Sequence, residues 1–124
     1  MEEREIYSLL GDSGFQELVG LFYGQIPHDE ILGHIYPKND LAGAEQRLRD
    51  FLIFRFGGPQ RYIEKRGHPR LRMRHFPFAV DRAARDRWVQ LMNTALDQIA
   101  LPDEAKQLLR SYFESTATAM MNRP

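Results

Sequence analysis

Apolar residues recur at helical spacing along most of this chain, and strong stop signals separate the helical stretches. The clearest stripe follows Asp81, a residue type that caps helices, and consists of Trp88, Leu91, Met92, Ala95, Leu96 and Ile99. Another stripe follows Asp40, runs from Leu41 to Leu52, and ends before Gly57-Gly58-Pro59, where proline cannot continue a helix. This spacing predicts helices and therefore an all-α fold.

Two further long helices complete the predicted set. Ser13 and Gln16 form a capping-box pattern that predicts a helix start after a short first helix, and Pro27 predicts its end. Pro102 opens a last helix, whose apolar face is Leu109, Tyr112, Phe113, Thr116, Ala117 and Met120. We expect a short segment over residues 29–36, an irregular stretch over 59–70 and a short helical piece over 70–76.

Length and composition predict one domain that spans residues 1–124. Apolar residues make up 43% of the chain and charged residues 27%, which is typical of a soluble globular protein. No apolar run approaches the ~20 residues that a membrane span needs. The first ten residues, MEEREIYSLL, carry three glutamates and one arginine, the wrong charge for a signal peptide, so we expect a cytoplasmic protein. Cysteine is absent, which excludes disulfides, cysteine zinc sites and thioether-linked haem.

Positive charge is concentrated in the centre of a chain whose net charge is zero. Residues 61–87 hold nine Lys and Arg against three Asp and Glu, whereas the rest holds eight against fourteen. This segment therefore predicts an anionic partner, and an all-α binding or sensor module that uses it is one hypothesis. Nucleic acid is disfavoured because the cluster surrounds a proline-broken segment instead of one recognition helix.

His75 lies within this basic segment, in the sequence HPRLRMRHFPF. The spacing of the four histidines gives little support to a metal site built from protein side chains alone. Haem, however, needs only one axial imidazole from the protein, because the porphyrin supplies four nitrogens. Arg72 and Arg74 lie beside His75 and suit the carboxylates of a haem. A surface histidine in a basic segment is the alternative interpretation.

Three stretches of the sequence closely resemble the group II truncated haemoglobins: YPKNDLAGAEQRLRDFL, FGGPQRYIEKRGHPRLRMRHFPF and RDRW. The combination is specific, because GGP closes a helix, GHPRLRMRH leads to a histidine, and a tryptophan follows thirteen residues later. The similarity extends over roughly residues 5–122. It implies a truncated globin, a two-over-two helical sandwich around one haem b (iron protoporphyrin IX).

The resemblance also implies roles for individual residues. His75 matches the proximal iron ligand, and the distal ligand-binding positions match Tyr23, Tyr36, Trp88, Ala44 and Leu48. Arg74 and Arg47 match positions that reach the haem propionates, with Tyr62, His68 and Arg72 as further cofactor-binding candidates. Many globins carry a distal histidine or glutamine where this chain has Ala44. Since alanine donates no hydrogen bond, Tyr36 and Trp88 must supply the donors.

Two donors in a dry pocket stabilise the negative charge that oxygen develops on ferrous haem, so we expect tight oxygen binding and slow release. The same site is expected to take CO and NO. Slow release suits oxygen and nitric oxide redox chemistry better than bulk transport, as in a nitric oxide dioxygenase or a peroxidase-like side activity. An unidentified reductase is an expected partner, and the chain is expected to be a monomer or a homodimer.

Overall fold

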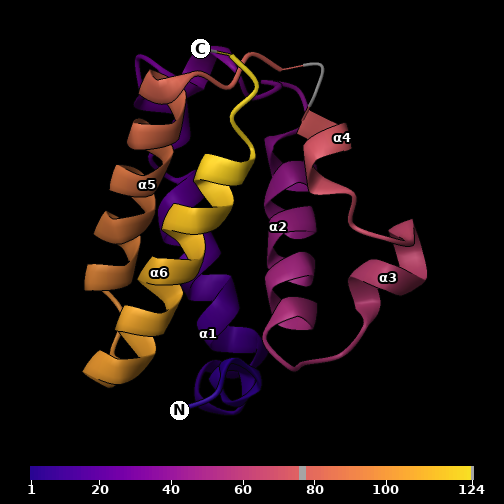
Figure 1. Cartoon of the computed structure of the whole chain (residues 1–124), viewed down its shortest axis with the longest axis vertical. Coiled ribbons are helices and arrows are strands. Elements are labelled where there is room, and N and C mark those ends of the chain that lie inside the picture. Colours follow the sequence, from indigo (N-terminus) through magenta and orange to yellow (C-terminus); the bar gives the residue numbers. More distant parts are fainter. Residues whose placement is uncertain (76–77, 124) are drawn as a thin grey trace.

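The computed structural model describes residues 1–75 and 78–123, and over these residues every regular element is a helix. Four of the helices are long: α1 (Ile6–Tyr23), α2 (Leu41–Arg55), α5 (Arg82–Asp97) and α6 (Asp103–Ala119). Figure 1 shows α2 running back along α1, and α6 running back along α5. Because α1 packs on both α2 and α5, it joins the two helix pairs. The predicted all-α class with four long helices is confirmed.

The core lies where the two pairs meet. The largest side chains at less than 2% exposure include Phe15, Leu18 and Phe22 of α1. They meet the predicted stripes of α5 and α6, of which Met92, Leu96, Leu109 and Phe113 are buried. Each such side chain stabilises the fold by about 1.5–3 kcal/mol through burial. The apolar periodicity of the sequence therefore identified the faces that bring the pairs together.

Helix α1 contains both the predicted short first helix and the longer helix that follows it. Helical backbone extends on both sides of Gly11, where φ is 65° and the helix is interrupted. A positive φ suits glycine, which has no Cβ to clash. The predicted start at Ser13 therefore lies two residues after the break. The helix ends at Tyr23, before Pro27, which instead lies in a 3-10 turn, η2 (Ile26–His28).

Helix α2 starts directly after Asp40, as its apolar stripe predicts, but without a side-chain cap. Asp40 is its N-cap residue, yet the carboxylate makes no capping bond and instead accepts a hydrogen bond from Arg47 at 3.1 Å. Beyond the helix, Gly57 has φ 98°, and a Cβ there would lie 2.4 Å from the carbonyl oxygen of Arg4. The predicted glycine stop is thus also a close approach between backbone segments.

The predicted irregular stretch over 59–70 is wrong in part, because it contains the short helix α3 (Arg61–Arg66). Six residues are too few for periodicity to show in the sequence. Tertiary contacts stabilise the helix, because Tyr62 is buried against the Phe51 ring and Arg61 pairs with Asp12.

The remaining elements are short. They are η1 (Glu3–Glu5), η3 (Leu32–His34) and α4 (Leu71–His75). The predicted helical piece over 70–76 agrees with α4, although Phe76 lies outside the described residues.

Asp81 caps α5 as predicted, since its carboxylate accepts a hydrogen bond from the Ala84 N–H at 2.9 Å. Among the described helices, none is long and apolar enough to cross a membrane.

Candidate functional site

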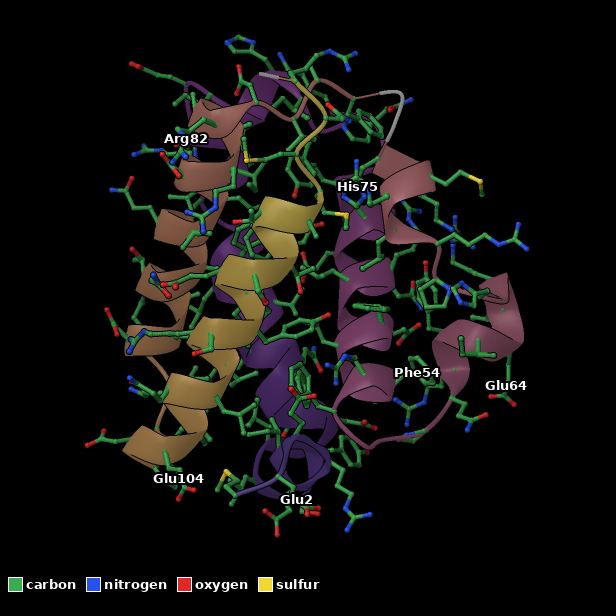
Figure 2. The ribbon with its side chains drawn as sticks, in the orientation of Figure 1. Glu2, Phe54, Glu64, His75, Arg82 and Glu104 are labelled. Atoms are coloured by element: carbon green, nitrogen blue, oxygen red, sulfur yellow. The ribbon has the colours of Figure 1, made fainter. Side chains whose placement is uncertain are left out.

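His75 is the last residue of α4, and a hydrogen bond to its own helix holds its ring. The Nδ1 atom lies 2.7 Å from the Leu71 carbonyl oxygen, so Nδ1 carries the proton and donates. In the neutral form of the ring, this bond leaves Nε2 as the nitrogen without a proton, as a metal ligand requires. Figure 2 shows the half-buried His75 between α4 and the upper part of α2.

The backbone that leads into α4 is constrained. Arg70 has φ 44°, in the left-handed region that residues other than glycine seldom adopt. Its N–H donates to Nδ1 of the exposed His68 at 3.2 Å. Pro69 and this turn set the start of α4, so His68 lies before the helix that carries His75 and shares no helical face with it.

Arg74 makes most of the contacts among the predicted cofactor-binding residues. Its guanidinium donates to the Tyr62 hydroxyl at 2.9 Å, to the Arg66 carbonyl at 2.8 Å and to the His68 carbonyl at 3.2 Å. The guanidinium also lies over the Tyr62 ring, 5.5 Å from its centroid. The structure therefore brings Arg74, Tyr62 and His68 together next to His75.

The other two predicted cations have different neighbours. Arg47 of α2 pairs with Asp40, the residue before that helix, at 3.1 Å, with the Arg47 side chain half-buried and the Asp40 side chain exposed. Arg72 donates to the Ala119 carbonyl at the end of α6, at 2.6 Å. Arg72 therefore tethers α4 to α6 in this structure.

An aromatic cluster joins α1, α5 and α6 to the residues that follow η3. The indole N–H of Trp88 on α5 donates to the Tyr36 hydroxyl at 3.1 Å. Tyr23 at the end of α1 meets the Tyr36 ring edge to face, with centroids 5.6 Å apart. Phe22 and Phe113 flank the indole at centroid distances of 5.2 and 5.6 Å. The three predicted polar aromatics thus form one cluster.

Both tyrosine hydroxyls keep their protons at any physiological pH. Burial raises the pKa of Tyr36 to about 12, against the opposing effect of hydrogen bonds from Trp88 and Tyr23. Burial, followed by the proximity of Tyr36, raises the pKa of Tyr23 further above its ordinary value. The oxygen of Tyr36 already accepts the Trp88 N–H, so the Tyr36 proton is directed to another acceptor.

Apolar side chains at the edge of the core complete the site. Ala44 and Leu48 lie one turn apart on α2, so they share a face of that helix. They pack against the core but stay partly exposed, as do Leu71 of α4, Tyr36 and Trp88. Of the residues that the structure describes in α4, none is buried.

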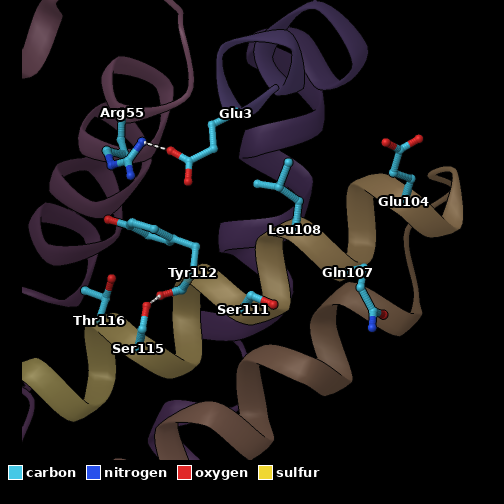
Figure 3. A pocket seen from close by; sticks show the side chains of 9 residues that line it. All are labelled: Glu3, Arg55, Glu104, Gln107, Leu108, Ser111, Tyr112, Ser115 and Thr116. Carbon is cyan, nitrogen blue, oxygen red and sulfur yellow. Dashed lines mark hydrogen bonds and ion pairs between the residues drawn. The ribbon is translucent and has the colours of Figure 1, made fainter. Parts of the chain in front are cut away.

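Two cavities adjoin α6. One, of about 550 Å³, lies between α2, residues 68–72 and α6, and is lined mainly by apolar groups including Phe51, Phe54, Leu71 and Met120. The other, of about 540 Å³, lies between the N-terminal residues, the end of α2 and α6. Figure 3 shows that Arg55 pairs there with Glu3 above the Tyr112 ring. This second cavity is lined by none of the predicted site residues, so it does not define the site.

Most cations of the basic segment 61–87 have partners within the chain. Arg61 pairs with Asp12, Lys65 approaches Asp50, and Arg85 bonds to Thr118. Arg72, Arg74 and Arg87 also have partners. These cations therefore already bind groups of the same chain. This weakens the hypothesis of a module that binds an anionic partner through this segment.

Nothing in the sequence pattern indicated the ion pair between the buried Asp29 and the half-buried Arg87. Asp29, whose side chain is 1% exposed, accepts a hydrogen bond from Nε of Arg87 at 2.5 Å. It also accepts the backbone N–H groups of Ile31 and Leu32. Burial alone raises a carboxyl pKa, but the bonds from Leu32, Arg87 and Ile31 outweigh it and lower the pKa of Asp29 below its ordinary value. An aspartate that lies two or three residues before the N–H groups it accepts is a local turn signal. No such local signal identifies Arg87 as the partner of Asp29, because the two residues are 58 apart in the chain.

These residues fit haem as a group. A haem needs an axial ligand for its iron, apolar contacts for its ring and cations for its two carboxylates. Nε2 of His75, the partly exposed apolar edge and the guanidinium of Arg74 match these three needs. Over the described part of the chain, no group of three or more acidic or histidine side chains is arranged to hold a metal ion.

Comparisons with known proteins agree with this geometry. The model of the bacterial-like globin family matches residues 5–122. The chain is 34% identical over 117 residues to a group 2 truncated haemoglobin of Bacillus subtilis, with 94% of this chain and 88% of that protein covered. A thermostable haemoglobin of the actinobacterium Thermobifida fusca has a TM-score of 0.92 at 45% identity, covering 96% of this chain and 98% of that one. A truncated oxygen-avid haemoglobin of Bacillus subtilis has a TM-score of 0.89 at 34% identity, covering 94% and 98%.

The chain therefore belongs to the bacterial-like globins, a family whose members bind haem and diatomic gases such as oxygen. Within that class it is a truncated haemoglobin of group II, as its relatives and structural neighbours show. The predicted family and the two-over-two helical sandwich are both confirmed.

Proposed function

We propose that residues 1–124 form one domain that binds haem b through His75 and holds oxygen tightly for redox chemistry. The observation that carries the tight binding is the Trp88 hydrogen bond to the Tyr36 hydroxyl. This bond makes the Tyr36 oxygen an acceptor, so the Tyr36 O–H remains available to donate a hydrogen bond to a polar ligand. When bound, the haem supplies the iron that takes oxygen, CO or NO.

His75 supports the proximal half of this proposal. Its Nδ1 donates to the Leu71 carbonyl, which orients the ring and makes Nε2 more basic. Arg74, and Arg47 after it leaves Asp40, are the cations we assign to the propionates. Tyr62 supports Arg74 by accepting its hydrogen bond, and His68 lies at the same edge.

The distal half follows from preorganised donors beside apolar side chains at the edge of the core. Tyr36 donates to the ligand, Trp88 and Tyr23 hold the Tyr36 hydroxyl, and Ala44 with Leu48 provides an apolar wall. Donors that are already oriented stabilise developing negative charge without a reorganisation cost. Slow oxygen release follows, and it parallels the oxygen-avid relative from Bacillus subtilis.

A held oxygen favours reaction over transport. One such reaction converts oxygen and nitric oxide into nitrate. Each nitrate formed consumes one electron from the protein, so a reductase must supply that electron again. This requirement is the reason for proposing a reductase as a partner. We also propose that the protein acts in the cytoplasm, as a monomer or a homodimer.

The first test is the visible absorption spectrum of the purified protein beside that of His75→Ala, in ferric, ferrous and ferrous-CO forms. We expect a histidine-ligated haem in the wild type and its loss or loosening in the variant. A wild type that is colourless and takes up no added haem refutes the proposal. Salt-dependent binding of the colourless protein to an anionic partner would then favour the binding module instead.

A further inference from the structure

Helix α4 is held differently from the four long helices. Each long helix buries several side chains, whereas no described residue of α4 is buried. Apolar packing therefore does little to set its position. Hydrogen bonds from other elements must set it instead, and they are directional.

Several of these bonds come from the C-terminal end of the chain. Nδ2 of Asn122 donates to the His75 carbonyl at 3.2 Å and to the Phe78 carbonyl at 2.9 Å. The Oδ1 atom of Asn122 accepts the Val80 N–H at 2.9 Å, and the Asn122 backbone N–H donates to the Val80 carbonyl at 2.9 Å. One side chain thus bridges the end of α4 and the residues that lead into α5.

A second contact ties the start of α4 to the same place. Arg72 donates to the Ala119 carbonyl, the last residue of α6, at 2.6 Å. Figure 1 shows the C-terminal tail passing from α6 toward the segment that precedes α5. Arg72 and Asn122 therefore attach both ends of the short helix to residues 119–122.

We propose that Asn122 is a positioning residue for His75, and that residues 119–122 act with Arg72 as a clamp on α4. The His75 ring is bonded to the Leu71 carbonyl of the same helix, so it moves with the α4 backbone. Holding the His75 carbonyl therefore fixes where Nε2 lies. This inference rests on the proposed role of His75 as the haem ligand.

Asn122→Asp is the sharpest test because it replaces only the side-chain NH2 group by oxygen and keeps the shape of the side chain. The aspartate still accepts the Val80 N–H but cannot donate to the two carbonyls. Arg123→Ala is the matched control, since over the described residues the Arg123 side chain hydrogen-bonds only to the carbonyl oxygen and Oδ1 of Asn122, so its removal leaves both Nδ2 donors in place. Arg72→Met, which removes the other attachment, is the second variant if Asn122→Asp does not fold.

Two measurements on the haem-loaded protein report on His75 directly. They are the iron–histidine stretching frequency of the ferrous form and the rate of haem transfer to an excess of a competing apoglobin. Two lost hydrogen bonds predict about tenfold faster haem loss, with a shifted or broadened iron–histidine band. Arg123→Ala should match the wild type in both.

Amide hydrogen exchange over residues 71–75 separates this inference from the proposed function. Faster exchange in Asn122→Asp than in Arg123→Ala supports the clamp, whether or not haem is bound. Wild-type exchange, haem loss and iron–histidine frequency in both Asn122→Asp and Arg72→Met would overturn it. A wild-type protein without haem would instead refute the proposed function, and the exchange rates would still decide the clamp.

Discussion

The hydrogen bond between Trp88 and Tyr36 allows the two residues' roles to be separated. Tyr36→Phe removes the hydroxyl and its proton while the ring stays against Tyr23. A hydrogen bond to a charged or partly charged acceptor is worth about 1.5–3 kcal/mol, and 1.4 kcal/mol is about tenfold. Oxygen dissociation should therefore speed up about 10- to 150-fold, measured by stopped flow after displacing oxygen with CO.

Trp88→Phe should have a smaller effect on the same rate. It removes the N–H that holds the Tyr36 hydroxyl at 3.1 Å, while phenylalanine keeps an aromatic ring between Phe22 and Phe113. A neutral hydrogen bond is worth about 1 kcal/mol, which predicts about fivefold faster dissociation. The double variant should release oxygen no faster than Tyr36→Phe alone, because Trp88 then has nothing to orient.

Two results would refute this reasoning. If Tyr36→Phe leaves the oxygen dissociation rate unchanged, Tyr36 is not the donor. If the two changes multiply in the double variant, Trp88 acts on the ligand itself, as the family resemblance implies, and not through Tyr36. CO binding is the control, because CO develops less negative charge and should respond weakly to both changes.

Three further predictions concern the ligand, the ion pair of Asp29 and a glycine. His75→Gly should lose the histidine-ligated haem spectrum, and added imidazole should restore it, because the free base replaces the missing ring; no recovery in a folded variant would argue against His75 as ligand. Asp29→Asn should lower the free energy of unfolding by about 1.5–3 kcal/mol at pH 7, measured in urea. Since the folded pKa of Asp29 is lowered, its contribution is present above the unfolded value of about 3.9 and disappears as pH falls through the folded pKa, so the two proteins should converge in acid; a constant difference would contradict the charge argument. Gly57→Ala should destabilise more than Gly67→Ala, because both have positive φ but only the Cβ at 57 meets backbone, 2.4 Å from the Arg4 carbonyl oxygen; equal melting temperatures would show that the close approach is not retained.

The sequence predicted those parts of the fold that depend on local chemistry and apolar periodicity. Helix α5 is an example, because its stripe, its Asp81 cap and its length were all readable, and the structure agrees. Helix α3 is the opposite case. It has six residues, and its stability comes from Tyr62 against Phe51 and from Arg61 with Asp12, residues 49 apart in the chain. Sequence periodicity carries no information about such a pair.

The candidate site divides in the same way. The residue types came from the family resemblance, and the structure brings Tyr23, Tyr36 and Trp88 into one cluster. The contacts between them were not predictable, since Tyr36 and Trp88 are 52 residues apart and either could have faced elsewhere. The sequence also did not show that Arg72 reaches α6 or that Arg47 pairs with Asp40, because long cations have many partners within reach.

The residues that hold the two sides of the site were missed for a common physical reason. Asp29 and Arg87 fasten the turn before Tyr36 to α5, one residue from Trp88, and Asn122 fastens the end of α4 at His75. Tyr36 and His75 both lie on short segments that bury little apolar surface, so packing alone cannot fix them. Directional polar contacts with distant residues can do so, and they leave no periodic trace in the sequence. Loss of Asn122 should therefore alter the haem ligation, whereas loss of Asp29 should alter oxygen release, although neither residue belongs to the predicted site.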